Sequence, residues 1–343
     1  DKESKSYFDY FTPFKKEYHG SDKVIDVASL LVKILSHDRI KNQLVAAICA
    51  TEKCNLSVQE KLLTLELPHL AQVLVTGVLA EGDEEKFLFR PIPNFIFTRD
   101  IGITVKDHIL LSRFAEDARS REAILMKYVS FYGLMGEEIS DALAENVIEL
   151  EEKSDWSADD KKKPSGRFVT VEGGDVMMIS PEHLLIGYSV RTSVQAIEQV
   201  VHQLFGKKLV QKVTAIKIPA ERSYMHIDTV FTHIKRGLWV MFSPFSKDFG
   251  KPATGEIDVA AAVKRETANK KSDVEITQFI RNDNADGHSI ETKQYDYLDD
   301  LLKAISREEF GVKNPEIVLS AGGEYPYAPV SYTHLRAHET QFH

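Results

Sequence analysis

Apolar residues in the first quarter of the chain recur every three or four positions. One series runs from Val24 to Ile34 and a second from Ile40 to Ile48. This spacing places apolar side chains on one face of a helix. Pro68 stands where a further helix would begin, since proline is tolerated in a first helical turn. The pattern predicts a mostly helical block over about residues 22–79.

From Phe87 onwards the apolar runs become short and are separated by glycine, proline and charged turns, which is typical of strands. One pattern occurs three times: an aspartate, a strand, a short polar turn and a second strand. The aspartates are Asp100, Asp175 and Asp228. Each would occupy the same end of its own hairpin. Helical stretches are predicted after the first two hairpins, at about 116–129 and 192–205.

The unequal spacing of these units excludes a solenoid, whose repeats have a constant length. A propeller or another pseudo-symmetric α/β repeat remains, and either would gather the three carboxylates around one axis. Two polar segments, residues 151–164 and about 264–292, are predicted to be surface loops or lids. A solvated connection is the favoured interpretation of both.

The composition fits a globular protein with a sizeable core. The 343 residues leave room for about two domains, at roughly 150 residues each. With 43 Lys and Arg against 52 Asp and Glu, the net charge is −9, and no long basic block occurs, which argues against nucleic-acid or membrane-surface binding. No apolar run is long enough for a membrane span. The two cysteines, Cys49 and Cys54, are too few for a disulfide framework and fit a reducing, cytoplasmic compartment.

Acidic residues and one histidine stand at the positions that these hairpins would bring together. His226 and Asp228 flank a single residue, so in a strand they point to the same face. Glu172 and Asp175 enclose a pair of glycines, whose missing side chains let a ligand or another backbone approach. Either segment alone is more often structural. Together with Asp100 in the same hairpin position, they indicate a functional site.

Carboxylates with one histidine serve two main kinds of site, a metal centre or a site for a guanidinium-type cation. Metal hydrolases usually have more imidazole or thiolate ligands, and neither H-E-x-x-H nor C-x-x-C occurs in the chain. A planar guanidinium has five donors that match carboxylates, so the residues present would suffice. Arg119 and Arg191 lie shortly after the second strands of the first two hairpins, where each could clamp a substrate carboxylate or make a surface ion pair.

Four segments resemble motifs of the arginine deiminases, in the order that this family has them. Residues 93–100 resemble P-N-x-x-F-T-R-D, residues 171–175 the E-G-G-D segment, residues 189–192 S-x-R-T, and residues 226–231 H-x-D-T-V-F. The resemblance extends from about Tyr7 to Tyr327. It implies the α/β fold of the guanidino-group-modifying superfamily, a pentein-type propeller of ββαβ modules with an inserted, mainly helical domain. The helical block and the hairpin repeat agree with that fold.

The resemblance also implies a role for each matching residue. Catalytic roles go to Asp100, Glu172, His226 and Asp228. Asp100 and Asp228 would hold the guanidinium nitrogens, while Glu172 would orient His226, the general acid and base. Substrate-binding roles go to Asn94, Phe97, Arg119, Arg191 and Asp175, with the arginines on the α-carboxylate.

The implied reaction is the hydrolysis of L-arginine to L-citrulline and ammonia, a step of arginine catabolism. A cysteine thiolate attacks the guanidinium carbon, ammonia leaves after protonation by the histidine, and water releases citrulline from the covalent intermediate. No metal or organic cofactor takes part. The implied partner is the small-molecule substrate, with no nucleic acid or membrane, in a cytoplasmic enzyme that is a homo-oligomer at full length.

The sequence departs from the family near its ends. No cysteine follows Cys54, so the nucleophile of the family's C-terminal segment is missing, and the 343 residues as they stand are expected to be inactive. The predicted division is a partial first module over 1–21, a helical insertion over 22–85, incomplete propeller modules over 86–329 and a non-native tail over 330–343. The chain is interpreted as a fragment.

Two alternatives stay open. One is an agmatine deiminase or amidinotransferase of the same superfamily, which Arg119 and Arg191 disfavour because agmatine has no carboxylate. The other is a non-catalytic arginine-binding fragment or a metal-dependent hydrolase built on His226 and Asp228. Elemental analysis for metal would separate the hydrolase from the rest.

Overall fold

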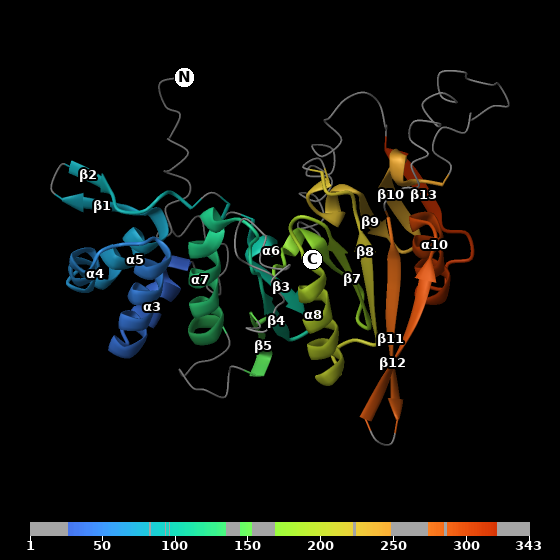
Figure 1. Ribbon diagram of the computed structural model, residues 1–343, viewed down its shortest axis with the longest axis horizontal. Helices are drawn as coiled ribbons and strands as arrows, with labels where there is room; N and C mark the ends of the chain where they lie inside the picture. Colours follow the sequence, from blue (N-terminus) through green and yellow to red (C-terminus); the bar gives the residue numbers. More distant parts are fainter. Residues whose placement is uncertain are drawn as a thin grey trace, which may run out of the picture. The chain divides into compact units, whose positions relative to one another are not determined.

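The computed structural model describes residues 27–81, 84–92, 94–95, 97–134, 145–152, 169–221, 224–247, 274–284 and 287–320. Contacts divide the chain into two compact units, one of residues 1–96 and 118–147 and the other of residues 97–117 and 148–343. Figure 1 labels the helices and strands of both. The segments 1–21 and 330–343, predicted as a partial module and a tail, lie outside the described residues.

The first unit is mainly helical. Its helices are α2 (Val27–Leu35), α3 (Asp38–Thr51), α4 (Leu56–Leu63), α5 (Leu67–Thr76) and α7 (Ser120–Val129), with a π-helical turn over Ser130–Leu134. An antiparallel hairpin, β1 (Val78–Glu81) and β2 (Glu84–Phe87), follows α5. The predicted helical block is confirmed from residue 27 to residue 76, and residues 22–26 lie outside the described part. None of the described helices is long and apolar enough to cross a membrane.

The sequence explains where α5 begins and ends. Pro68 stands in its first turn, where the missing N–H breaks no helical hydrogen bond. Gly77 ends the helix with a φ of +80°, in the left-handed region that favours glycine. A Cβ at this position would also lie 2.6 Å from the carbonyl oxygen of Phe89. The apolar faces of the helices then meet in one buried cluster.

Helix α7 belongs to this unit, although it follows the first hairpin of the other one. Leu125 and Val129 are buried in the helical core. Arg121 is buried as well, with its NH1 atom 2.8 Å from Glu52 Oε1. The compact units therefore divide elsewhere than at residue 86, because the buried side chains of α7 return residues 118–147 to the helical unit.

The second unit is built from repeats of two strands, a helix and a strand. In the second repeat, β6 (Val176–Ser180) and β7 (His183–Tyr188) form an antiparallel hairpin, α8 (Val194–Gly206) follows, and β8 (Lys212–Lys217) runs parallel to β7. The third repeat has β9 (Phe231–Lys235), β10 (Leu238–Phe242), α10 (Leu298–Glu308) and β13 (Glu316–Ser320), which runs parallel to β10.

The first repeat has the hairpin β3 (Gly102–Val105) and β4 (His108–Leu111), with β5 (Val147–Ile148) beside β4. All three predicted hairpins are confirmed, and the fold is α/β with repeated modules. The strands of the described residues form separate sheets, one for each module and one for the β1–β2 hairpin. Closure of the modules into a propeller stays a prediction.

The prediction of a surface loop over about 264–292 is wrong for its second half. Residues Ile276–Asn284 form β11 and residues Gly287–Tyr295 form β12, a long antiparallel hairpin. Strand β11 pairs with β8, so the sheet of the second module has five strands in the order β12-β11-β8-β7-β6. The β11–β12 hairpin has a polar composition because the side chains of residues 289–294, on the edge strand β12, are all exposed. The other predicted loop, 151–164, lies outside the described residues from position 153 onward.

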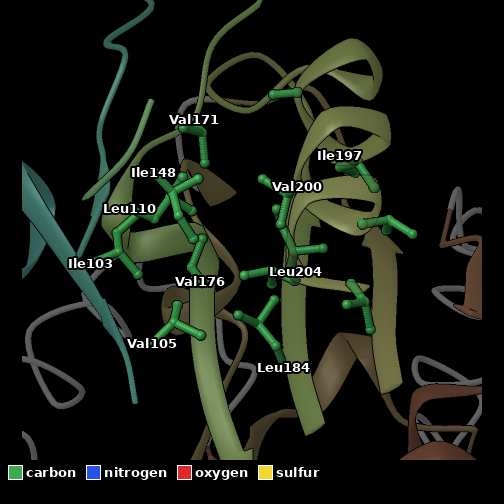
Figure 2. Close-up of a cluster of buried hydrophobic side chains, with 14 of the residues drawn as sticks. Ile103, Val105, Leu110, Ile148, Val171, Val176, Leu184, Ile197, Val200 and Leu204 are labelled. Atoms are coloured by element: carbon green, nitrogen blue, oxygen red, sulfur yellow. The ribbon is translucent and has the colours of Figure 1, made fainter. Parts of the chain in front are cut away.

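The first two modules share one hydrophobic core. Figure 2 shows Val200 and Leu204 of α8 close to Leu184 of β7, and Ile103 of β3 close to Val176 of β6, all in one buried cluster. Full burial of one such side chain contributes about 1.5 to 3 kcal/mol relative to exposure. The shared core holds the two hairpins together and so sets the positions of the acids that precede them.

Candidate active site

The three aspartates of the repeats occupy equivalent positions. Asp100, Asp175 and Asp228 each lie in a short helical turn directly before the first strand of a module: α6 (Thr98–Ile101), Gly173–Asp175 and Ile227–Thr229. Two of the carboxylates reach the following turn. Asp100 Oδ1 accepts a hydrogen bond from the N–H of Gly174 over 3.1 Å, and Asp175 Oδ1 accepts one from the N–H of Ile227 over 3.0 Å. The three turns therefore lie together, as the hairpin repeat predicted.

Crowding explains the two glycines between Glu172 and Asp175. A Cβ on Gly173 would overlap the carbonyl group of Arg99, and a Cβ on Gly174 would overlap the imidazole of His226. The sequence predicted a close approach of a ligand or another backbone at this pair. The structure has backbone against one glycine and an imidazole against the other, so the meeting of the three turns requires both.

His226 and Glu172 form the centre of the site. The Nε2 atom of His226 lies 2.9 Å from Glu172 Oε2, and the N–H of Ala115 donates to Glu172 Oε1 over 3.1 Å. Glu172 is only 1% exposed. Burial favours its neutral form, but the hydrogen bond and charge of His226, with the N–H of Ala115 and the charge of Arg191, lower the pKa of Glu172. The pair is thus a buried ion pair.

The imidazole is held in its charged form by the surrounding acids. Burial lowers the pKa of His226, but the hydrogen bond to Glu172 and the charges of Asp175 and Asp228 raise that pKa to about 9. His226 is therefore an imidazolium at neutral pH.

Asp228 lies beside an arginine that was not predicted to belong to the site. Arg99 NH1 is 3.8 Å from Asp228 Oδ2, and Arg99 NH2 donates to the carbonyl oxygen of Val176 over 2.5 Å. Burial raises the pKa of Asp228 to about 6, against the opposing charges of Arg99 and His226. The signal for Arg99 was its position directly before Asp100, inside a motif in which Asn94, Phe97 and Asp100 were assigned roles.

Asp175, predicted to bind the substrate, has none of its surface exposed. The hydroxyl of Thr192 donates to Asp175 Oδ2 over 2.7 Å, while Oδ1 accepts the N–H of Ile227. Burial raises the pKa of Asp175 to about 7, although His226 and these two donors act to lower it. Both carboxylate oxygens therefore have a donor from the protein.

Two further predicted substrate contacts, Arg191 and Phe97, lie in the same unit. Arg191 NH1 is 3.4 Å from Glu116 Oε1 and 3.7 Å from Glu172 Oε1. These separations exceed those of good charge-assisted hydrogen bonds, which are about 2.7 to 2.9 Å. Phe97 directly precedes α6 and is 52% exposed. Arg191 thus lies near the pair of Glu172 and His226 but makes no short hydrogen bond with Glu172.

Asn94 and Arg119, also predicted to bind the substrate, belong to the first unit. Glu122, which is fully buried, joins them: its Oε1 accepts the N–H of Asn94 over 3.0 Å, and its Oε2 accepts Nε and NH2 of Arg119 over 3.0 and 2.9 Å. The substrate contacts of Asn94 and Arg119 stay predictions. Sequence reasoning missed Glu122, for which the spacing of three from Arg119 along a helix was the available signal.

The two cysteines lie in the first unit, and neither is activated. Burial raises the pKa of the Cys49 thiol to about 11 and also raises the pKa of Cys54. A raised pKa disfavours the thiolate, which is the nucleophilic form. Within the residues that the structure describes, no group of three or more His, Cys, Asp or Glu side chains is arranged to hold a metal ion.

The repeated modules, the buried ion pair of His226 and Glu172 and the neighbouring carboxylates define an α/β protein with an acidic, histidine-containing site. A family model described as arginine deiminase matches residues 24–135 and 140–303. The chain belongs to the arginine deiminase family.

Individual relatives agree with this family. The arginine deiminase of Bacillus cereus is 30% identical over 232 residues, which are 62% of this chain and 52% of that protein. The arginine deiminase of Limosilactobacillus reuteri is 28% identical over 247 residues, 66% of this chain and 56% of that protein. The chain spans about half the length of the curated relatives it matches.

Two solved structures show similarity as well. One is a DDAH mutant from Pseudomonas aeruginosa complexed with citrulline, with 18% identity, a TM-score of 0.33 and coverage of 47% of this chain and 50% of that one. The other is the amidinotransferase SxtG from Microseira wollei, with 15% identity, a TM-score of 0.32 and coverage of 49% of this chain and 47% of that one.

Proposed function

We propose that this chain carries the guanidinium-binding and acid–base residues of an arginine deiminase, which hydrolyses L-arginine to L-citrulline and ammonia. The proposal rests on the buried pair of Glu172 and His226 beside the carboxylates of Asp100 and Asp228. A planar, cationic guanidinium matches carboxylates that approach it from different elements. The carboxylates would keep the bound guanidinium cationic and its central carbon electrophilic.

The protonation state of His226 suits the two proton transfers of this reaction. As an imidazolium at neutral pH, with a pKa of about 9, His226 can donate a proton to the departing ammonia. The neutral imidazole that results can accept a proton from the water that attacks the covalent intermediate. Glu172 would orient the ring in both steps, because its hydrogen bond to Nε2 holds the imidazole in place.

Arg191 is the proposed contact for the α-carboxylate of the substrate. Its guanidinium has long contacts with Glu116 and Glu172 and donates a hydrogen bond to the sulfur of Met225 over 3.7 Å, so a substrate carboxylate can offer it shorter hydrogen bonds. Agmatine lacks that carboxylate. The arrangement therefore favours arginine over agmatine as the ligand.

The nucleophile of the proposed reaction is a cysteine thiolate that these 343 residues do not supply. Cys49 and Cys54 have raised pKa values and belong to the helical unit. We therefore expect the chain as it stands to bind arginine without converting it. Assembly into a homo-oligomer and a cytoplasmic location stay predictions.

Isothermal titration calorimetry with L-arginine tests the proposed function on the folded chain. Wild type should bind, and Asp228→Asn should lose at least about tenfold in affinity, since removing a partner of a buried charge costs about 3 to 5 kcal/mol. Asp107→Asn is the matched control, because Asp107 lies in the exposed turn between β3 and β4. No heat of binding with folded wild type, or equal affinity in Asp228→Asn, would overturn the proposal.

A further inference from the structure

A closed ring of hydrogen bonds runs behind the central pair. The N–H of Glu172 donates to Thr192 Oγ1 over 3.3 Å, and the hydroxyl of Thr192 donates to Asp175 Oδ2 over 2.7 Å. Asp175 Oδ1 accepts the N–H of Ile227 over 3.0 Å. Ile227 is bonded to His226, whose Nε2 returns to Glu172 Oε2 over 2.9 Å. The ring thus fixes the backbone behind both members of the pair.

The ring has no room for a substrate atom. Asp175 and Thr192 have none of their surface exposed. On one side, a Cβ at Gly187 would lie 2.7 Å from Asp175 Oδ1 and would overlap the side chain of Ile227. Both oxygens of Asp175 have a donor from the protein, and its complete burial leaves a substrate guanidinium no space there.

We propose that Asp175 and Thr192 are positioning residues, which hold Glu172 and His226 in register, and that Asp175 does not bind the substrate. This inference rests on the proposed function of the same site. It assigns Thr192 a role that its place in the S-x-R-T segment did not reveal, and it moves Asp175 out of the set of substrate contacts. Such outer hydrogen bonds set the orientation of the groups that act on a ligand.

The hydroxyl of Thr192 is the part of the ring that a substitution can remove most cleanly. It accepts one hydrogen bond and donates another, which a valine of nearly the same shape cannot do. Thr192→Val would leave the N–H of Glu172 and Oδ2 of Asp175 buried without partners. Because buried polar groups rearrange to regain partners, the carboxylate of Glu172 would lose its alignment with the imidazole.

Titration of the His226 imidazole by NMR, without arginine, tests in the full chain whether Asp175 and Thr192 hold Glu172 and His226 in place. We call this positioning role the tether. In Thr192→Val the pKa of His226 should fall by about one unit or more, and the affinity for arginine by about tenfold, while Thr192→Ser should restore both. Thr192→Ala provides the same loss of hydroxyl with a smaller side chain. Ser193→Ala is the matched control, because this neighbouring hydroxyl caps α8 and lies outside the ring.

The outcomes separate the tether from the proposed function. A fall in the pKa of His226 confined to the Thr192 variants, with no arginine binding by wild type, would support the tether and contradict the function. An unchanged pKa in Thr192→Val, or an equal fall in Ser193→Ala, would overturn the tether. In wild type, the amides of Glu172 and Ile227 should exchange with deuterium as slowly as those of β7. Faster exchange would overturn the tether without any substitution.

Discussion

Glu172 and His226 are joined by a hydrogen bond of 2.9 Å although 54 positions separate them in the sequence. Each lies in a turn before a different ββαβ module, and the two turns meet because Gly174 leaves room for the imidazole. The pair can therefore form only when the second and third modules are packed together. This links the geometry of the proposed acid–base pair directly to the stability of the fold.

The Glu172–His226 pair makes the free energy of unfolding fall as the pH becomes alkaline. The pKa of His226 is raised from its ordinary 6.5 to about 9, so the folded chain binds this proton more tightly than the unfolded chain does. The contribution is fully present below pH 6.5 and is lost as the pH rises through 9. Urea unfolding should therefore show the free energy of unfolding falling between pH 7 and 9, by at most about 3 kcal/mol.

Glu172→Gln is the comparison for that measurement. It removes the charge that holds the imidazolium, so the pKa of His226 should move toward its ordinary value and the decline between pH 7 and 9 should shrink. The raised pKa values of Asp175 and Asp228, about 7 and about 6, act mainly below this window. A decline of the same size in Glu172→Gln would show that another group causes it.

Asp228 should be an example of a functional residue that lowers stability. Its pKa is raised by burial to about 6, so the folded chain disfavours the ionised carboxylate that predominates at pH 8. Asp228→Asn should increase the free energy of unfolding at pH 8 by about 1 to 2 kcal/mol, a gain limited by the loss of the Arg99 contact. At pH 4 the gain should disappear, because the wild-type side chain is then protonated. Destabilisation at pH 8 would contradict this account.

The carboxylate of Glu309 holds the end of α10 on the sheet of the second module. Glu309 Oε1 lies 2.7 Å from His183 Nδ1, and Lys212 Nζ lies 3.2 Å from the same oxygen. Burial opposes ionisation of Glu309, but His183, Ser180 and Lys212 together lower its pKa to about 2. Its contribution to stability is present above the ordinary pKa of 4.5 and is lost as the pH falls through 2.

Glu309→Gln should therefore destabilise the chain at pH 7 by about 2 to 3 kcal/mol and flatten the loss of stability between pH 4.5 and pH 2. Thermal unfolding followed by circular dichroism across this range would measure it. Glu316→Gln is the control, because Glu316 is an exposed residue of β13 in the same module. If both variants lost the same stability between pH 4.5 and pH 2, Glu309 would not be the group that causes this loss.

Arg191 should determine the preference for arginine over agmatine. If it binds the α-carboxylate, Arg191→Ala removes about 1.5 to 3 kcal/mol from arginine binding and little from agmatine binding, so the discrimination should fall at least about tenfold. Competition calorimetry with the two ligands measures the ratio. Arg236→Ala, at the exposed turn between β9 and β10, should leave the ratio unchanged. Equal losses for both ligands in Arg191→Ala would make Arg191 structural.

Local patterns predicted what local sequence determines. The alternation of strands and turns after Asp100, Asp175 and Asp228 was sufficient for the hairpins, because a hairpin is specified by residues close in sequence. The β11–β12 hairpin was missed because its edge strand faces water and carries few apolar residues. Its pairing depends on β8, some sixty residues earlier in the chain.

The same distinction holds for the site. Glu172, His226 and the aspartates were predicted from motifs, whereas the contacts of Arg99 and Thr192 across the fold, and those of Glu122 with Asn94 and Arg119, came from the structure. Asp175 shows most clearly what a short sequence motif cannot predict. Its carboxylate looked equivalent to those of Asp100 and Asp228, and only its complete burial between Thr192 and Ile227 distinguishes it. Burial of this kind follows from the packing of modules and has no signal in a short segment.

The last prediction is that the 343 residues bind arginine but release no citrulline. Cys49 and Cys54 are the only cysteines of the sequence. Burial raises the pKa of both thiols, so the thiolate population of each is small at neutral pH. Efficient attack also requires a thiolate at about 3 to 3.5 Å from the guanidinium carbon. A colorimetric citrulline assay on the purified chain should therefore give no signal above the blank.

Supplying a cysteine-bearing C-terminal segment from an arginine deiminase should produce citrulline, and the same segment with that cysteine changed to serine should not. Wild-type chain without the segment is the matched control for spontaneous hydrolysis. The added thiolate restores activity only if the acidic residues and His226 already stand in a competent arrangement, so this experiment also tests the geometry around Glu172. Turnover by the 343-residue chain that disappears in Cys54→Ala would show instead that Cys54 acts as the nucleophile.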